Sequence, residues 1–489
     1  KVGKPMLMFK LILSIAVIYL IGLTVLKIIL PDVKRHLLET LALSFGLGTG
    51  VISLITVLIF HARISVDLIN LLSVVVFLLI YFIYRENIKR STCVSTTTIT
   101  NNYQDLLREK ICSLKNIIRG LNTLEIFLIL VVAVSVVLVS FHAMFKPMFN
   151  YDAISIWAFK AKIFFTEQTI FTDDFYNPDR LHYHPKYPIL IPSVENWIYN
   201  CLGCISDRLV KIIFPLFYVS LLFLFYTAQR RSCTRQYSLI FTALLATIPA
   251  FVRSDQGGGA FSGYADMPLA FFYASGVIYL FLWMKYKKKE DLIISAILSG
   301  LAMFTKNEGL GYFIITFFCL SVFILFNTNR ETLKQNIKFI SMFMVISGFI
   351  VLPWLIISMG IPVFSEEENY PDRLSVFVIV GNFSRVPIIF TSFCGELIDI
   401  RRWNIIWILF GVAVIGGMKY VLRSLVKYLI LMLLLDFAML VLVYIIIPWD
   451  VRFAISTSMT RLIIQITPVA VFIVSQQIGM VMKCENDIS

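Results

Sequence analysis

The chain has 489 residues, 58% of them hydrophobic and 15% charged, whereas a soluble domain is about 45–50% apolar and about 25% charged. This composition excludes a soluble globule, a disordered chain and a disulfide-stapled secreted module, and it indicates an all-α polytopic membrane protein. The net charge of +13 comes from short basic clusters between apolar runs, as the positive-inside rule expects, so we predict no nucleic-acid partner.

Apolar segments follow one another along most of the chain. A helix needs about 20 mostly apolar residues to cross a bilayer, and this window predicts about 13 transmembrane helices. In chain order the predicted spans are 11–30, 38–60, 64–84, 125–144, 209–228, 237–253, 265–284, 291–305, 311–327, 337–359, 404–422, 428–447 and 461–482. The stretch 291–305 is short for a crossing. The apolar stretch 375–394 contains Asn382, Arg385 and Pro387, so we expect an interfacial or re-entrant segment there.

Basic residues mark one side of this bundle as cytoplasmic. They gather in alternate connections, namely 85–124, 230–235, 285–289, 330–338 and 419–427. We therefore expect a multi-pass protein of the cytoplasmic (plasma) membrane, with its N terminus outside. The unusual polar residues fall in the opposite loops, which predicts an outward-facing site: 145–208, 254–264, 306–310, 360–403 and 448–460.

The first outer loop begins with an acidic residue, Asp152, directly after a predicted span. Residues 153–165 have the periodicity of an amphipathic helix, and we expect this helix to lie in the headgroup plane with Lys160 nearby. Asp152 then occupies a position where aspartate commonly caps a helix by accepting a hydrogen bond from a backbone N–H. Capping and catalysis are compatible, so both roles stay open.

The same loop ends in the proline-rich segment His182-Tyr183-His184-Pro185-Lys186-Tyr187-Pro188. Its prolines impose an irregular backbone, which at membrane depth is tolerated only where it lines a protein cavity. His182 and His184 are candidate metal ligands, or they hydrogen-bond a ligand phosphate or sugar. Carboxylates that could complete such a metal site are Asp152, Asp173 and Asp174.

The later outer loops contain further charged residues. Arg253 precedes the run 257–259 of three glycines, which allows close backbone approach to a ligand or forms a flexible turn. Asp266 begins the next span, either as a helix cap or as a site residue. Lys306 and Glu308 lie between two apolar helices, where ionisable residues usually face a cavity; a structural ion pair is the alternative.

Arg461 and Gln465 are four residues apart at the start of the last predicted helix, so both side chains lie on one face of it. The planar guanidinium of an arginine suits phosphate oxygens. The alternative for Arg461 is that its side chain snorkels to the membrane interface.

The order and placement of these segments resemble those of C-type (GT-C) glycosyltransferases that use lipid-phosphate sugars. The most similar are the bacterial relatives of the protein O-mannosyltransferase and aminoarabinose-transferase group. The resemblance covers about residues 125–470 and is carried by Tyr151-Asp152, His184-Pro185-Lys186-Tyr187-Pro188, Gly263-Tyr264-Ala265-Asp266-Met267-Pro268, Lys306-Asn307-Glu308-Gly309 and Thr460-Arg461. The family often has a paired acid at the first of these sites, whereas Tyr151 and Ala153 flank Asp152 here.

The resemblance implies transfer of a sugar, with inversion, from a polyprenyl-phosphate donor in the outer leaflet to a glycan, lipid or protein acceptor. Asp152 would be the general base on the acceptor hydroxyl. The residues that would bind the donor phosphate are Lys186, His184, Lys306, Arg461 and Arg253. The residues that would bind the sugar or acceptor are Tyr151, Tyr187, Asp266, Tyr264, Glu308 and Gln465. No cofactor is certain, and a divalent metal stays an open alternative.

The resemblance also divides the chain. Residues 1–124 would be an N-terminal transmembrane extension with a basic cytoplasmic loop, and residues 125–359 the catalytic transmembrane core with the first outer loop 145–208. Residues 360–403 would form an outer loop with the interfacial or re-entrant segment, and residues 404–489 the C-terminal transmembrane helices.

Two other functions remain on the sequence alone. A transporter or flippase of a lipid-linked or anionic substrate also has many spans and intramembrane charge, but it predicts charges spread across membrane depth. Here Asp67 and Asp436 are the main ionisable residues in the middle of spans. A ligase or polymerase of lipid-linked glycans would share an arginine-rich outer site and use a different base.

Overall fold

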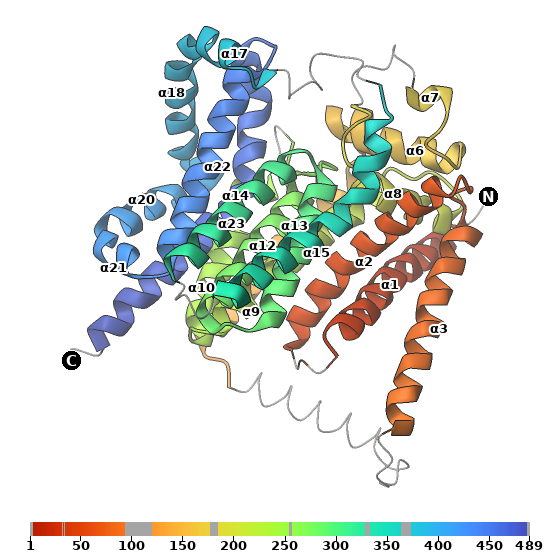
Figure 1. Cartoon of the computed structure of the whole chain (residues 1–489), viewed down its shortest axis with the longest axis horizontal. Coiled ribbons are helices and arrows are strands. Elements are labelled where there is room, and N and C mark those ends of the chain that lie inside the picture. Colours follow the sequence, from red (N-terminus) through yellow and green to blue (C-terminus); the bar gives the residue numbers. More distant parts are fainter. Residues whose placement is uncertain are drawn as a thin grey trace.

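The computed structural model describes residues 3–31, 33, 35–92, 120–176, 184–253, 257–327, 333–362 and 373–486. All regular secondary structure in these residues is helical, which confirms the predicted all-α membrane architecture (Figure 1). In this described part, ten helices are long and apolar enough to cross a membrane. They are α1 (Lys4–Ile29), α2 (Leu37–His61), α3 (Leu68–Thr92), α5 (Thr123–Phe145), α9 (Ile213–Arg230, with the preceding turn η3, Val210–Ile212), α12 (Asp266–Tyr286), α14 (Glu308–Phe326), α15 (Leu333–Met359), α22 (Val426–Ile446) and α23 (Val451–Asn486).

Ten of the 13 predicted spans thus correspond to these long helices, and the other three are shorter helices in the described residues. The span 237–253 becomes α10 (Arg235–Ala246), because the chain turns before Pro249 begins α11 (Pro249–Val252). The span 291–305 is α13 (Lys289–Thr305), with 17 residues. The span 404–422 is divided at Gly417 into α20 (Ile406–Gly416) and α21 (Met418–Arg423).

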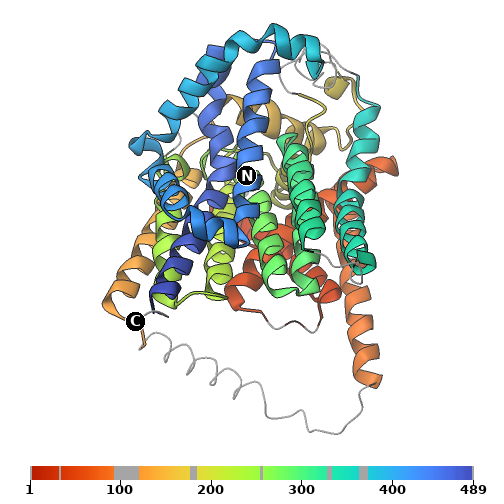
Figure 2. The same cartoon turned by 60° about the vertical axis from the view of Figure 1, so that its left-hand side comes forward.

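The segment 375–394 forms no long helix, as predicted. It contains α17 (Val376–Gly381), the turn η6 (Phe383–Arg385) and α18 (Val386–Leu397), and the side chain of Phe377 is 93% exposed. Arg385 donates to the carbonyl of Ile447 at 2.8 Å, which ties the segment to the end of α22. Figure 2 shows α17 and α18 lying along this end of the molecule.

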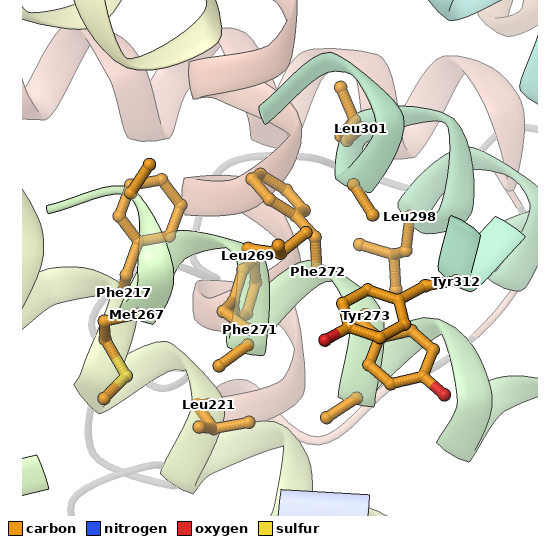
Figure 3. Packing of buried hydrophobic residues seen from close by; sticks show 14 of the residues in the cluster. Phe217, Leu221, Met267, Leu269, Phe271, Phe272, Tyr273, Leu298, Leu301 and Tyr312 are labelled. Atoms are coloured by element: carbon orange, nitrogen blue, oxygen red, sulfur yellow. The ribbon is translucent and has the colours of Figure 1, made fainter. Parts of the chain in front are cut away.

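Helix α12 forms the centre of the molecule, and every residue from Asp266 to Met284 is buried. It packs against α9, α13 and α23. Figure 3 shows Phe271 and Phe272 of α12 beside Phe217 of α9, with ring centroids 5.6 and 5.5 Å from that of Phe217. Such ring packing fixes the position of α12 against α9.

The two N-terminal helices α1 and α2 approach each other very closely. A Cβ atom on Gly22 would lie 1.7 Å from the carbonyl oxygen of Ser44, and one on Gly48 would lie 2.0 Å from that of Ile18. Small residues permit such backbone contact between membrane helices. Helix α2 also packs against α9 and α8 (Leu190–Leu202), so the N-terminal helices adjoin the centre of the molecule.

Candidate active site

Asp152 lies seven residues after the end of α5 and directly precedes a π-helix, η1 (Ala153–Ala158), that continues as α6 (Phe159–Thr166). The side chain of Asp152 makes no capping hydrogen bond, so the helix-capping role considered for Asp152 is wrong. Instead, its Oδ2 lies 2.7 Å from Nη2 of Arg461, and the carboxylate stays 23% exposed. Short π-helical turns occur frequently at functional sites. The turn therefore presents a charged, accessible carboxylate.

Arg461 on α23 joins two carboxylates that are far apart in the sequence. Besides Asp152, its Nε contacts Oδ2 of Asp266 at 3.3 Å. Its guanidinium lies 4.3 Å from the ring centre of Tyr264. Gly258 has φ +81 and a Cβ there would be 2.9 Å from Cγ of Arg461, so only glycine fits against this arginine without a shift. The interfacial alternative for Arg461 is therefore wrong, because the side chain is engaged inside the protein.

Asp266 is completely buried at the first residue of α12. Its Oδ1 accepts from Nζ of Lys306 at 2.9 Å and from Nε2 of Gln465 at 2.6 Å. Gln465 and Arg461 thus meet the same carboxylate, which confirms that they share one face of α23. A buried carboxylate is stable only when it is paired and hydrogen-bonded, and these contacts meet that condition.

Lys306 lies between α13 and α14, and it links Asp266 to Glu308. Its Nζ lies 2.7 Å from Oε1 of Glu308. Burial alone would lower the pKa of Lys306, but the carboxylates of Asp266 and Glu308 raise it above its ordinary value. The other oxygen of Glu308, Oε2, is buried and accepts no hydrogen bond from the described residues. Glu308 thus pairs with Lys306 through Oε1 and keeps Oε2 as a hydrogen-bond acceptor without a partner among the described residues.

Tyr264, in the second outer loop, connects this loop to the start of the helix at Asp152 in the first outer loop. Its hydroxyl accepts from the backbone N–H of Asp152 at 3.3 Å. Burial, with a further contribution from the carboxylate of Asp152, raises the pKa of Tyr264 to about 12. The phenol is therefore protonated at neutral pH and can donate a hydrogen bond.

A second layer of polar residues supports Gln465. The hydroxyl of Tyr312 donates to Oε1 of Gln465 at 2.8 Å. The rings of Tyr312 and Tyr273 stack with centroids 4.3 Å apart, and Figure 3 shows this pair. The hydroxyl of Tyr273 donates to Asp436 of α22. Of this layer, only Asp436 had a sequence signal, namely a carboxylate in the middle of an apolar span.

The proline-rich segment is attached to α6 by Lys160, which lies within the predicted amphipathic helix 153–165. Lys160 is buried, and its Nζ donates to the carbonyls of His184 at 2.6 Å and Tyr187 at 3.1 Å. His184 has φ +48, and its ring stacks on that of Tyr187 at 4.8 Å. The side chain of Lys160 therefore faces the protein interior, and the expected headgroup position of the helix stays a prediction. Lys160 thus binds the carbonyls of the two residues that precede Pro185 and Pro188, and these bonds fix the shape of the turn.

The remaining candidates lie outside the charged cluster. Tyr151 is 62% exposed, and the exposed Arg253 forms no ion pair with the described residues. Lys186 is half-buried and likewise has no ion pair with the residues that the structure describes. His182 lies outside the described residues. In the described chain, no group of three or more His, Cys, Asp or Glu side chains is arranged to hold a metal ion.

The charged cluster contains Asp152, Tyr264, Asp266, Lys306, Glu308, Arg461 and Gln465. Residues 191–357 match the dolichyl-phosphate-mannose-protein mannosyltransferase family model. This match confirms the family resemblance over about a third of the chain, including Tyr264, Asp266 and Lys306 but not Asp152 or Arg461. Together with the ten apolar helices, it indicates an integral membrane glycosyltransferase of the C type. No curated protein and no solved structure matches the chain.

Proposed function

We propose that the chain transfers a sugar from a polyprenyl-phosphate donor to an acceptor hydroxyl on the outer side of the plasma membrane, with inversion. The observation that carries the proposal is the 2.7 Å contact between Asp152 and Arg461. It sets an accessible carboxylate beside a cation that suits a phosphate. Glycosyl transfer from a lipid phosphate requires both groups at one place.

In the proposed reaction, Asp152 accepts the proton of the acceptor hydroxyl. The acceptor oxygen forms a bond to the anomeric carbon while the bond from that carbon to the phosphate oxygen breaks. The electron pair of the broken bond stays on the polyprenyl phosphate, which leaves with one more negative charge. Arg461 and Lys306 stabilise that charge, since preorganised cations act most strongly where charge develops.

The contacts of Asp266 favour a role other than sugar binding. Its two oxygens already take hydrogen bonds from Lys306, Gln465 and Arg461. We infer that Asp266 positions the two cations. Glu308 suits a sugar hydroxyl better, because its Oε2 is buried and free of a partner among the described residues. Tyr151 and Tyr187, from the first loop, remain proposed contacts to the acceptor, and Lys186, His184 and Arg253 proposed contacts to the donor.

The test uses the full chain in nanodiscs with polyprenyl-phosphate mannose as donor and a cell-envelope extract as acceptor source. Mass spectrometry follows the donor and the glycosylated product. Asp152→Asn should reduce transfer about 100- to 10,000-fold, as loss of a general base does. The matched control is Asp291→Asn, which removes a carboxylate from a different arginine pair. Equal turnover of Asp152→Asn and wild type would discard Asp152 as the base.

The competing function is a transporter or flippase of the same lipid. The accessible carboxylate of Asp152 beside Arg461 favours the enzyme, since the ion network around Arg231 and Asp291 at the other end of α12 has carboxylates only 7% and 4% exposed. In proteoliposomes, a transporter would deliver the intact donor to the other leaflet, whereas the proposed enzyme consumes it. An intact, translocated donor without any glycosylated product would replace the transferase by the transporter.

A further inference from the structure

A recess lies between the turn that joins α2 to α3 and the loop that follows α6. Its volume is about 330 Å³, within the range of about 300–1,000 Å³ that small-molecule sites have. Its lining combines polar and apolar side chains, namely Arg63, Ser65, Glu167, Gln168 and Thr169 together with Ile64 and Phe171. Arg63 and Ser65 come from the predicted N-terminal extension, outside the stretch that matches the family.

The two walls of the recess are held to each other. The N–H of Val66 donates to the carbonyl of Gln168 at 2.8 Å, and the rings of Phe60 and Phe164 pack edge to face at 5.1 Å behind it. Arg63 and Gln168, on opposite walls, both have left-handed backbones, with φ +58 and +54. Each of the two directly follows the C-cap residue of a helix, α2 or α6, where a left-handed residue commonly ends the helix, so these conformations shape the two walls.

The chemistry of the lining combines a cation, a carboxylate and a ring. The guanidinium carbon of Arg63 lies 3.4 Å from the ring centre of Phe171, so the arginine stacks on the ring. Arg63 and Glu167 are both exposed and form no ion pair with each other or with other described residues. The guanidinium N–H groups and the carboxylate oxygens thus stay available in the same recess. Sugar hydroxyls donate and accept hydrogen bonds at once, whereas Glu167 would repel a phosphate.

The recess is too far from the candidate base to hold the sugar that reacts there. Asp152 lies at the start of an unbroken helical run, residues 151–166, and Glu167 directly follows its end, so the two are roughly 20 Å apart at ~1.5 Å per residue. The α6 helix, between them, consists of eight residues. A ligand that occupies both places must therefore be an extended chain.

We propose that this recess binds a distal sugar unit of a glycan acceptor whose reacting hydroxyl lies at Asp152. The proposal rests on the transferase function and names the class of its acceptor. It also gives the N-terminal extension a part in acceptor binding, through Arg63.

The test measures binding without any transfer. Saturation-transfer NMR with free mannotriose and maltotriose is recorded on the full chain in nanodiscs. Arg63→Ala should reduce the signal of the bound trisaccharide at least fivefold. Gln168→Gly removes the amide and also relieves the left-handed backbone, so it should fold readily and weaken binding. The matched control is Arg401→Ala, a 91% exposed arginine on α19 (Ile400–Trp403), which should leave the signal unchanged.

Three outcomes would overturn the recess as a glycan site. The first is that neither trisaccharide binds, and the second is equal binding by wild type and both recess variants. The third is displacement by inorganic phosphate, which would indicate an anion site. Asp152→Asn should keep trisaccharide binding while it loses transfer. Its transfer assay therefore tests the proposed function, and the binding assay tests the recess, independently of each other.

Discussion

Two arginines in this molecule have nearly the same surroundings at the two ends of α12. Arg461 lies between Asp152 and Asp266, with the ring of Tyr264 at 4.3 Å. Arg231 lies between Glu39 at 2.7 Å and Asp291 at 2.8 Å, with the ring of Tyr279 at 5.5 Å. Thirteen residues of α12 separate Asp266 from Tyr279, or ~20 Å at ~1.5 Å per residue.

The difference between the two arginines lies in the access to their carboxylates. At Arg231, the side chains of Glu39 and Asp291 are 7% and 4% exposed, and the hydroxyl of Tyr279 donates to Glu39. At Arg461, Asp152 is 23% exposed on a π-helical turn. An arginine between two acids is therefore no sign of catalysis by itself. We infer that an accessible carboxylate distinguishes the candidate site from a structural ion network.

The largest expected effect comes from replacing each arginine by lysine. A lysine keeps the charge but cannot contact two carboxylates in the same planar geometry. Arg461→Lys should reduce transfer of mannose about 100- to 1,000-fold, the range for removal of a transition-state donor. Arg231→Lys should keep the turnover of the folded protein and lower its unfolding temperature. Turnover and thermal unfolding of both variants, Arg461→Lys and Arg231→Lys, are measured in nanodiscs and compared with wild type. Loss of activity in both variants alike would remove the distinction between the two sites.

The next effect concerns the carboxylate oxygen without a partner. Glu308→Gln should weaken donor binding by about 1.5–3 kcal/mol, or roughly 10- to 150-fold in KM, because a hydrogen bond to a charged acceptor is lost. Glu39→Gln, the same change in the Arg231 network, should leave KM unchanged. Steady-state kinetics with varied polyprenyl-phosphate mannose separate the two. A change in kcat alone for Glu308→Gln would contradict a role in binding the sugar.

A smaller effect is expected from the layer behind Asp266. Tyr312→Phe leaves Oε1 of Gln465 buried without a donor, at a cost of about 1–3 kcal/mol in the free energy of unfolding. Because Gln465 holds Asp266, the variant should also lower kcat about tenfold with little change in KM. Tyr279→Phe loses the matching hydroxyl near Arg231 and should lower only the unfolding temperature. Full kcat in Tyr312→Phe would show that this layer serves packing alone.

The smallest effect concerns the pH dependence of stability. The folded-state pKa of Lys306 is raised, so its stabilising contribution is complete below the unfolded pKa of about 10.4 and declines as the pH rises through the folded value. Lys306→Arg stays charged throughout. The difference in unfolding temperature between wild type and Lys306→Arg should be constant from about pH 7 to 10. Above about pH 10 the unfolding temperature of wild type should fall relative to that of the variant. A shift already below about pH 9 would mean that Lys306 loses its proton early.

Much of the site has a local basis in the sequence. The spacing of Arg461 and Gln465 places both on one helical face, and both contact Asp266. Lys306 and Glu308 were marked by charge between two apolar helices, and they form a pair. Such residues are recognisable because a charge inside an apolar environment needs a partner, whatever that partner is.

The sequence by itself determined an all-helical membrane protein and which charged residues are costly enough to need partners. Only the tertiary structure decided the partners. Arg461 and Asp266 are 195 residues apart, Tyr273 and Asp436 163, and no local pattern links either pair. Lys160 became an internal tie because the proline-rich turn folds over α6, which its own periodicity does not indicate. Helix packing sets these meetings, since it depends on the combined shapes of many side chains rather than on any one segment.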